Sequence, residues 1–174
     1  LGCTNVTIID FDEVGEENVS CQLYSSFDVG KNKVEALKDK LLILSEITPD
    51  IKVKKIDSDF DVNEFKILIS AVDNMDARKI IFDRLKIADG SGHLLIDGRM
   101  AANNVQIYVT SFNNSEEIKF YEDTLFDSSE ALPIACSARS VVYNGFVIAG
   151  LITNTVAKIA NGKILPKELI IDLE

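Results

Sequence analysis

Short runs of β-branched and apolar residues recur along this 174-residue chain, and each run ends at an aspartate. The runs are Val6 to Asp10, Ile67 to Asp73 and Leu94 to Asp97. Continuous apolar runs of this length are typical of strands buried on both faces, as in parallel sheets. Because the carboxyl ends of parallel strands meet at one edge, where α/β proteins bind ligands, the three aspartates predict a site there.

Helical periodicity separates these runs. Apolar residues recur at helical spacing between Asp28, a candidate cap, and Glu46, and again over residues 76–88 and 147–160. Further strands are predicted at residues 51–56, 105–110 and 169–173. Alternating strands and helices predict an α/β fold with a mainly parallel sheet and helices on both faces. The length fits one domain, residues 1–174, in which the polar segment 111–130 is expected to be an irregular crossover loop.

Composition excludes several classes of protein. The chain carries 28 acidic and 18 basic residues, a net charge of -10, without a basic track for nucleic acid. Asn144, Asn154 and Lys158 interrupt its most apolar stretch, so we expect a buried helix there and no membrane span. Its three cysteines form neither a zinc motif nor a disulfide framework, which favours a reducing, cytoplasmic setting.

Asp10 is the first candidate site residue. An acid at this point of a βαβ unit is suited to hydrogen-bond a nucleotide ribose, although a strand-terminal aspartate also commonly caps a loop or helix. On this feature alone, a nicotinamide-dependent oxidoreductase is one possible interpretation.

Four separated segments together resemble the ordered motifs of the ThiF/MoeB/HesA family, which includes the ubiquitin-activating enzymes. The segments are IDFDEV at 9–14, Asn18 with Gln22, GKNKV at 30–34, and VDN at 72–74 with Arg78. The resemblance implies a Rossmann-like adenylation domain that binds ATP and Mg²⁺.

The resemblance also implies roles for individual residues. Asp10 would hold the ribose, with Asp12 in support or in metal contact, and Asn18 and Gln22 would lie in the loop beside the phosphates. Lys33, rather than Lys31, would bind the phosphates.

Asp73 would position magnesium in the same scheme. A fixed ammonium and a carboxylate-bound metal are the groups that would stabilise charge during adenylation. Two simpler interpretations stay open: Lys33 as a solvated lysine in a first helical turn, and Asp73 as the cap of the helix starting near Asp76.

Residues 132–140 resemble the segment that carries the catalytic cysteine in ubiquitin-activating enzymes, with one extra residue and a serine in place of threonine. Cys136 would then be a thioester nucleophile, and Arg139 would lower the pKa of its thiol. The alternative is that Cys136 is a small buried hydrophobic residue.

The sequence departs from the family pattern in three ways. The chain begins at Leu1, and the first strand and glycine-rich phosphate loop of the family are missing, so we expect the natural N-terminus to be absent. Cys21 stands where the family has an arginine, and the paired CxxC zinc motifs are absent.

The leading hypothesis is an ATP-dependent adenylyltransferase that activates the C-terminal carboxylate of a ubiquitin-like or sulfur-carrier protein, with possible thioester transfer to Cys136. The alternative is a non-catalytic ThiF-like scaffold or dimer subunit. The apolar helix at 147–160 is suited to a homodimer interface or to core packing.

Overall fold

The computed structural model describes residues 5–19, 21–45, 48–88, 92–101, 104–130 and 142–173. The chain forms two compact units, Leu1–Lys55 and Ile56–Glu174, and each is described by itself below.

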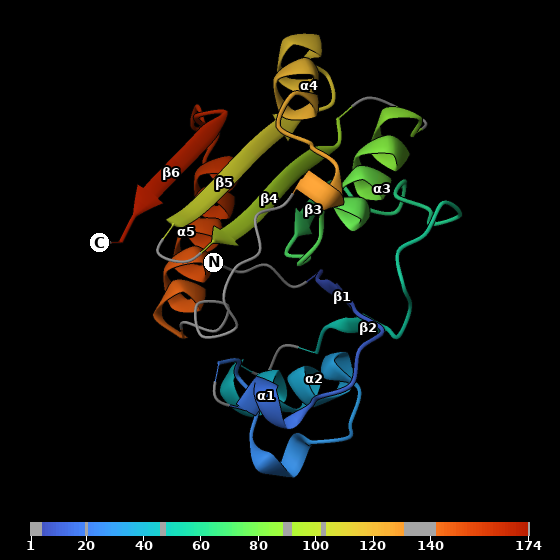
Figure 1. The fold of residues 1–174 in the computed structure, drawn as a ribbon, viewed down its shortest axis with the longest axis vertical. Helices are drawn as coiled ribbons and strands as arrows, with labels where there is room; N and C mark the ends of the chain where they lie inside the picture. Colours follow the sequence, from blue (N-terminus) through green and yellow to red (C-terminus); the bar gives the residue numbers. More distant parts are fainter. Residues whose placement is uncertain are drawn as a thin grey trace. The chain divides into compact units, whose positions relative to one another are not determined.

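The first unit contains a parallel β-α-β arrangement (Figure 1). Strand β1 (Thr7–Ile9) pairs in parallel with β2 (Asp50–Lys52). Between them the chain forms helix α1 (Glu16–Val19), the 3₁₀-helix η1 (Ser26–Asp28) and helix α2 (Lys33–Ser45). The apolar run ending at Asp10 is therefore a parallel strand, as its composition predicts.

Helix α2 begins later than expected, because Asp28 is not its cap. Ser25 and Asp28 instead form a capping box around η1, in which the Asp28 carboxylate accepts hydrogen bonds from the Ser25 backbone and hydroxyl, both at 2.7 Å. Lys40 of α2 forms an ion pair with the same carboxylate at 2.6 Å. The pKa of Asp28 is held below its ordinary value, first by the hydrogen bond from Lys40 and then by those from Ser25. Asp28 thus fixes the turn that leads to Lys33.

The second unit is built on a mixed sheet in the order β3-β4-β5-β6 (Figure 1). Strand β3 (Ile67–Ser70) pairs in parallel with β4 (Leu94–Ala101). Strand β5 (Asn104–Ser111) pairs antiparallel with both β4 and β6 (Glu168–Asp172). The expected α/β class is confirmed, and helix α3 (Met75–Lys86) makes the connection between the parallel strands.

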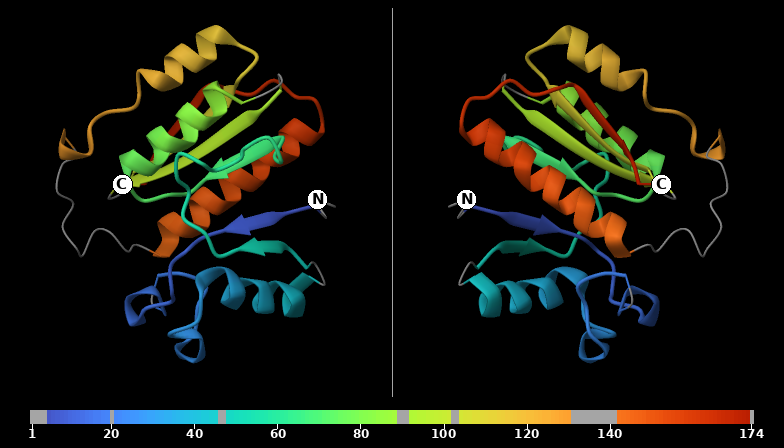
Figure 2. Two further views of the ribbon diagram at one scale, coloured as in Figure 1. Left: turned by 90° about the vertical axis from the view of Figure 1, so that its right-hand side faces the viewer. Right: turned by 90° about the vertical axis from the view of Figure 1, so that its left-hand side faces the viewer.

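Helix α5 (Val142–Ala160) covers one face of this sheet, and Figure 2 shows it on the side opposite to α3. Its apolar residues, including Ile148 and Ile152, pack on the buried side chains of β4 and β5. Gly98 allows this close approach, because a Cβ added there would lie 3.0 Å from Ile148 Cδ1 and 3.2 Å from Ile152 Cδ1. The helix expected in this region is present, but it is only partly buried, because Ile148 and Ile152 pack on the sheet whereas Phe146 is 70% exposed.

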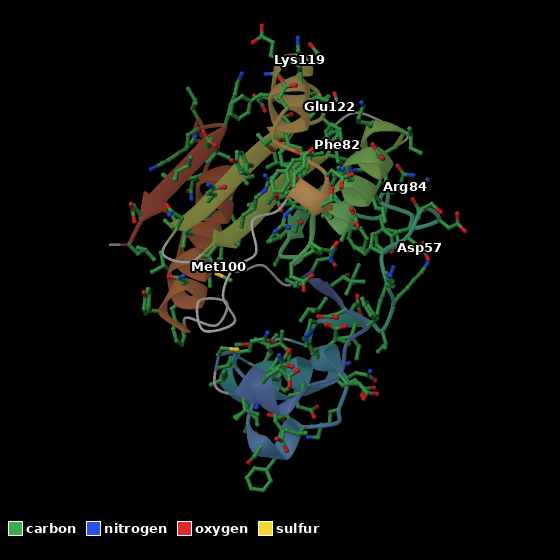
Figure 3. The ribbon with its side chains drawn as sticks, viewed as in Figure 1. Asp57, Phe82, Arg84, Met100, Lys119 and Glu122 are labelled. Carbon is green, nitrogen blue, oxygen red and sulfur yellow. The ribbon has the colours of Figure 1, made fainter. Side chains whose placement is uncertain are left out.

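The other face of the sheet is covered by α3 and by helix α4 (Ser115–Glu122). Phe82 of α3 and Tyr121 of α4 are fully buried, with ring centroids 5.5 Å apart, and Figure 3 shows Phe82 against the sheet. Tyr121 also contacts Tyr108 of β5 in an edge-on geometry. Aromatic packing therefore joins both helices to this face.

The prediction of an irregular loop over residues 111–130 is wrong in part, because this segment contains α4. Asn114 caps this helix by accepting hydrogen bonds from the backbone N–H groups of Glu116 and Glu117, and η2 (Ser128–Glu130) follows. The cap satisfies donors that a helix end otherwise leaves unpaired.

Candidate functional site

Two acids follow strand β1 in the first unit. Asp10 comes directly after the strand, and its carboxylate accepts a hydrogen bond from the backbone N–H of Asp12 at 2.9 Å. This bond turns the chain so that both acids lie in one short loop at the carboxyl end of β1. An acid at this edge is placed where α/β proteins bind nucleotides.

Lys33, the first residue of α2, is attached to this loop twice. Its backbone N–H donates to the Asp12 carbonyl at 2.9 Å, and its Nζ lies 2.8 Å from Asp12 Oδ2. The Lys33 side chain is only 15% exposed, whereas that of Asp12 is 46% exposed. The ammonium group is therefore held in place by a carboxylate that solvent reaches.

The ion pair leads to a prediction for Asp12→Asn. Because the Asp12 carboxylate competes with any phosphate for Lys33, its removal should tighten the binding of inorganic pyrophosphate in metal-free buffer by up to about fivefold, or about 1 kcal/mol. Titration calorimetry at low and high salt would measure this, and the gain should shrink at high salt. Glu13→Gln removes a neighbouring exposed charge and is the control. Unchanged or weaker pyrophosphate binding would contradict the prediction.

Asn18 is the buried residue of helix α1, and its side-chain oxygen accepts a hydrogen bond from the Gly15 N–H at 2.9 Å. Its backbone carbonyl accepts from Gln22 at 2.9 Å, and Gln22 itself is exposed. Cys21 is partly buried, with its Sγ 3.2 Å from the carbonyl of Glu17. Asn18 therefore shapes the loop that presents Gln22 and Cys21.

Asp73 belongs to the second unit, three residues beyond the end of β3. Its side chain is exposed, and Oδ1 accepts a hydrogen bond from Asn74 Nδ2 at 2.9 Å. The cap of α3 is Asn74, whose side chain accepts from the Ala77 N–H at 2.8 Å. Asp73 is thus not the capping residue, and its carboxylate stays accessible to a ligand.

A buried ionic network lies next to the Asp73 loop. Asp97 of β4 is fully buried and accepts hydrogen bonds from Arg78 Nε at 3.1 Å, from Arg99 Nε at 2.7 Å and from the Tyr121 hydroxyl at 3.0 Å. Burial and the charge of Asp97 raise the pKa of Tyr121, so its hydroxyl stays protonated and donates. Charged groups at this depth require partners of this kind.

Arg99 extends the network to the end of α4. It donates to the carbonyl of Thr124 at 3.0 Å and to its hydroxyl at 2.9 Å, and its guanidinium lies 4.4 Å from the centroid of the Tyr108 ring. Burial disfavours the charged form of Arg99, but the charge of Asp97 outweighs this effect and raises the pKa of Arg99. Asp97 and Arg99 therefore form an ion pair within strand β4.

The structure distributes the predicted site residues over both units. Five lie in the first unit, Asp10, Asp12, Asn18, Gln22 and Lys33, and Asp73 lies in the second. Cys136 and Arg139 lie outside the described residues. Sequence reasoning assigned no role to Arg78, although its position six residues after Val72 was part of the resemblance. Tyr121 gave no signal in the sequence.

No group of three or more His, Cys, Asp or Glu side chains gathers to hold a metal ion in the part of the chain that the structure describes. Nor do the described ranges contain a helix of sufficient length and apolar character to span a membrane.

Comparison with known proteins places this geometry in context. A family model described as the ThiF family matches residues 1–171 of the chain. No curated protein sequence matches this chain.

Solved structures provide further comparisons. The chain is similar to PaaA, with 22% identity and a TM-score of 0.69 over 98% of this chain and 53% of that one. It is similar to E. coli MccB crystallised with ATP, with 21% identity and a TM-score of 0.67 over 90% of this chain and 48% of that one. A further structure of E. coli MccB, with AMPCPP and MccA, gives 19% identity and a TM-score of 0.68 over 99% of this chain and 57% of that one. The chain spans about half the length of these proteins, and the similarity confirms the Rossmann-like fold.

Proposed function

The chain belongs to the ThiF family, and we propose that it is an adenylating enzyme that uses ATP to activate the C-terminal carboxylate of a protein or peptide. The structures of MccB crystallised with ATP, and with AMPCPP and MccA, support the proposal of a nucleotide and a second molecule bound by this chain. The family match over residues 1–171 supports a single adenylation domain.

The observation that carries the proposal is the position of Lys33. The helix dipole disfavours a cation in the first turn of a helix. Acidic side chains and bound anions are more common there. The Lys33 side chain is nevertheless only 15% exposed, and its ammonium lies beside Asp12 in the loop that follows β1. A phosphate group would satisfy both the helix N-terminus and this ammonium.

In the proposed reaction a carboxylate oxygen attacks the α-phosphorus of ATP. The bond from that phosphorus to the bridging oxygen breaks, and pyrophosphate leaves with the electron pair. Lys33 would stabilise the negative charge that grows on the phosphates. Asp10 would accept hydrogen bonds from the ribose, and Asn18 and Gln22 would flank the phosphates.

Asp73 fits a magnesium site, because Mg²⁺ prefers hard oxygen ligands and typically binds one or two carboxylates together with substrate phosphates. The Asp73 carboxylate is exposed and is not used as a cap. Mg²⁺ bound there would neutralise charge on the phosphates.

We propose a ubiquitin-like or sulfur-carrier protein as the substrate, in the cytoplasm, with the enzyme as a homodimer. Cys136 is the proposed acceptor in a second step, in which its thiolate attacks the acyl carbon and AMP leaves. Arg139 would favour the thiolate.

A second candidate function is a non-catalytic subunit, and Cys21 is the observation that favours it. Its side chain is short and neutral and contacts the Glu17 carbonyl, so it cannot form the two parallel hydrogen bonds that an arginine offers to a phosphate.

The proposal is tested by ATP–pyrophosphate exchange with the full-length protein and its encoded carrier. We expect exchange that requires both Mg²⁺ and the free C-terminal carboxylate, and a carrier with an amidated C-terminus is the matched control. Equal exchange with the amidated carrier would refute carboxylate activation. A protein that binds neither ATP nor Mg²⁺–ATP, yet forms a stable complex, would support the non-catalytic subunit instead. Preferential binding of NAD would favour the oxidoreductase.

A further inference from the structure

Arg78 donates hydrogen bonds to the backbone on both sides of Asp73. Its Nη1 donates to the carbonyl of Asn74 at 3.1 Å, and its Nη2 donates to the carbonyl of Val72. Nη2 also reaches the carbonyl of Gly98 at 3.2 Å. One guanidinium therefore ties the residues before and after Asp73 to strand β4.

The Arg78 guanidinium is also held by a buried carboxylate. Its side chain is 7% exposed, and its Nε donates to the fully buried Asp97. A planar guanidinium is suited to this task, because it offers five donors in a rigid fork, whereas an ammonium is a compact point charge on a flexible stem. Arg78 is itself held by Asp97, which Arg99 and Tyr121 hold in turn.

The arrangement leaves the Asp73 carboxylate out of the network. Among the described residues, Arg78 donates to the backbone carbonyls at positions 72 and 74, whereas the Asp73 carboxylate accepts from Asn74 Nδ2. The loop is thus anchored through its backbone, and the exposed carboxylate is left accessible to another partner. Arg78 therefore fits the role of a residue that orients a metal-binding carboxylate without binding that carboxylate itself.

We propose that Arg78 is a positioning residue for Asp73: it fixes the backbone of the loop so that this carboxylate is held ready for a divalent cation. The inference rests on the proposed function for the identity of the ligand, and on the Arg78 contacts for the geometry. Partners that orient a metal ligand typically change metal affinity or activity by about 10–100-fold when they are removed.

The test uses Arg78→Lys in the full-length protein, with Arg84→Lys as the matched control. Arg84 lies on the same helix, as Figure 3 shows, and donates to the Phe60 carbonyl at 2.9 Å. Mn²⁺ affinity in the presence of a non-hydrolysable ATP analogue, measured by electron paramagnetic resonance, should fall by about tenfold or more in Arg78→Lys and stay unchanged in Arg84→Lys. The Mg²⁺ concentration for half-maximal exchange should rise in parallel, with a much smaller change in kcat at saturating Mg²⁺.

A second measurement on the wild type keeps the inference testable if Arg78→Lys fails to fold. Backbone ¹⁵N relaxation should give Asp73 and Asn74 the order parameters of a rigid backbone, about 0.85, in the absence of nucleotide and metal. Values below about 0.6, or an unchanged Mn²⁺ affinity in folded Arg78→Lys, would overturn the inference. Absence of exchange in a wild type whose Mn²⁺ affinity still depends on Arg78 would overturn the proposed adenylation alone.

Discussion

Replacing Asp97 by asparagine is expected to lower the free energy of unfolding of the second unit by about 3–5 kcal/mol. The carboxylate is fully buried and is the counter-ion shared by two largely buried guanidinium groups, those of Arg78 and Arg99. Asparagine has nearly the same shape but no charge, so the variant leaves both cations in the interior without a counter-ion. Urea unfolding followed by near-UV circular dichroism would report the change, because Tyr108 and Tyr121 lie against this network.

Asp83→Asn is the control for this loss of stability. Asp83 is an exposed residue of α3 and loses the same charge, and exposed substitutions of this kind usually change stability by less than about 0.5 kcal/mol. A destabilisation of Asp97→Asn no larger than that of Asp83→Asn would show that the network does not carry the stability assigned to it.

Replacing Lys33 by glutamine is expected to reduce ATP–pyrophosphate exchange by about a hundredfold or more, the size of effect found when one group that stabilises developing charge is removed. Glutamine keeps much of the length of the side chain and loses the charge. Stability should change little, because Asp12, the partner of Lys33, is 46% exposed and such pairs contribute at most about 1 kcal/mol.

Lys31→Gln tests whether the effect belongs to position 33. Lys31 lies in the same turn, is 47% exposed and pairs with Asp28 at 3.6 Å. Its substitution should leave exchange within about threefold of the wild type, since a solvent-exposed charge such as that of Lys31 interacts only weakly with its surroundings. Equal losses in both variants would indicate a general effect of positive charge in this turn and would contradict the specific role of Lys33.

The strands of this fold could be predicted from the sequence because their signal is local. The runs that end at Asp10, Asp73 and Asp97 correspond to β1, β3 and β4, although β3 stops at Ser70 and β4 continues past Asp97 to Ala101, so Asp97 is not at a strand end. A run of consecutive apolar residues is visible without any knowledge of its neighbours, but it overstates burial, since Ile67 and Ile69 of β3 are 39% and 47% exposed.

The start of one helix and the whole of another were missed, for different reasons. Asp28 looks like the cap of α2, but Ser25 and Lys40 bind its carboxylate, so the helix starts only at Lys33. Helix α4 was missed because its residues are mostly polar. Asn114 followed three residues later by Glu117 is a pattern that marks helix starts and could have revealed it.

The network of side chains that anchors the Asp73 loop could not be predicted from the sequence, because its residues are far apart in the chain. Arg78 and Asp97 are 19 residues apart and meet only when α3 packs on β4, and Tyr121 joins from α4 a further 24 residues on. Spacing carries no information on such a meeting, whereas Asp97 and Arg99 are two residues apart in β4 and so share one face of the strand.

The sharing of Asp97 among three elements also affects how the second unit folds. Two positive charges from α3 and β4 depend on one carboxylate, whose remaining hydrogen bond comes from α4. An intermediate with α3 docked and α4 absent would lack the Tyr121 hydroxyl on Asp97 and the two Thr124 contacts of Arg99. Such a state would contain poorly satisfied buried charge and would be scarcely populated. Helices α3 and α4 should therefore dock on the sheet, and leave it, as one cooperative unit.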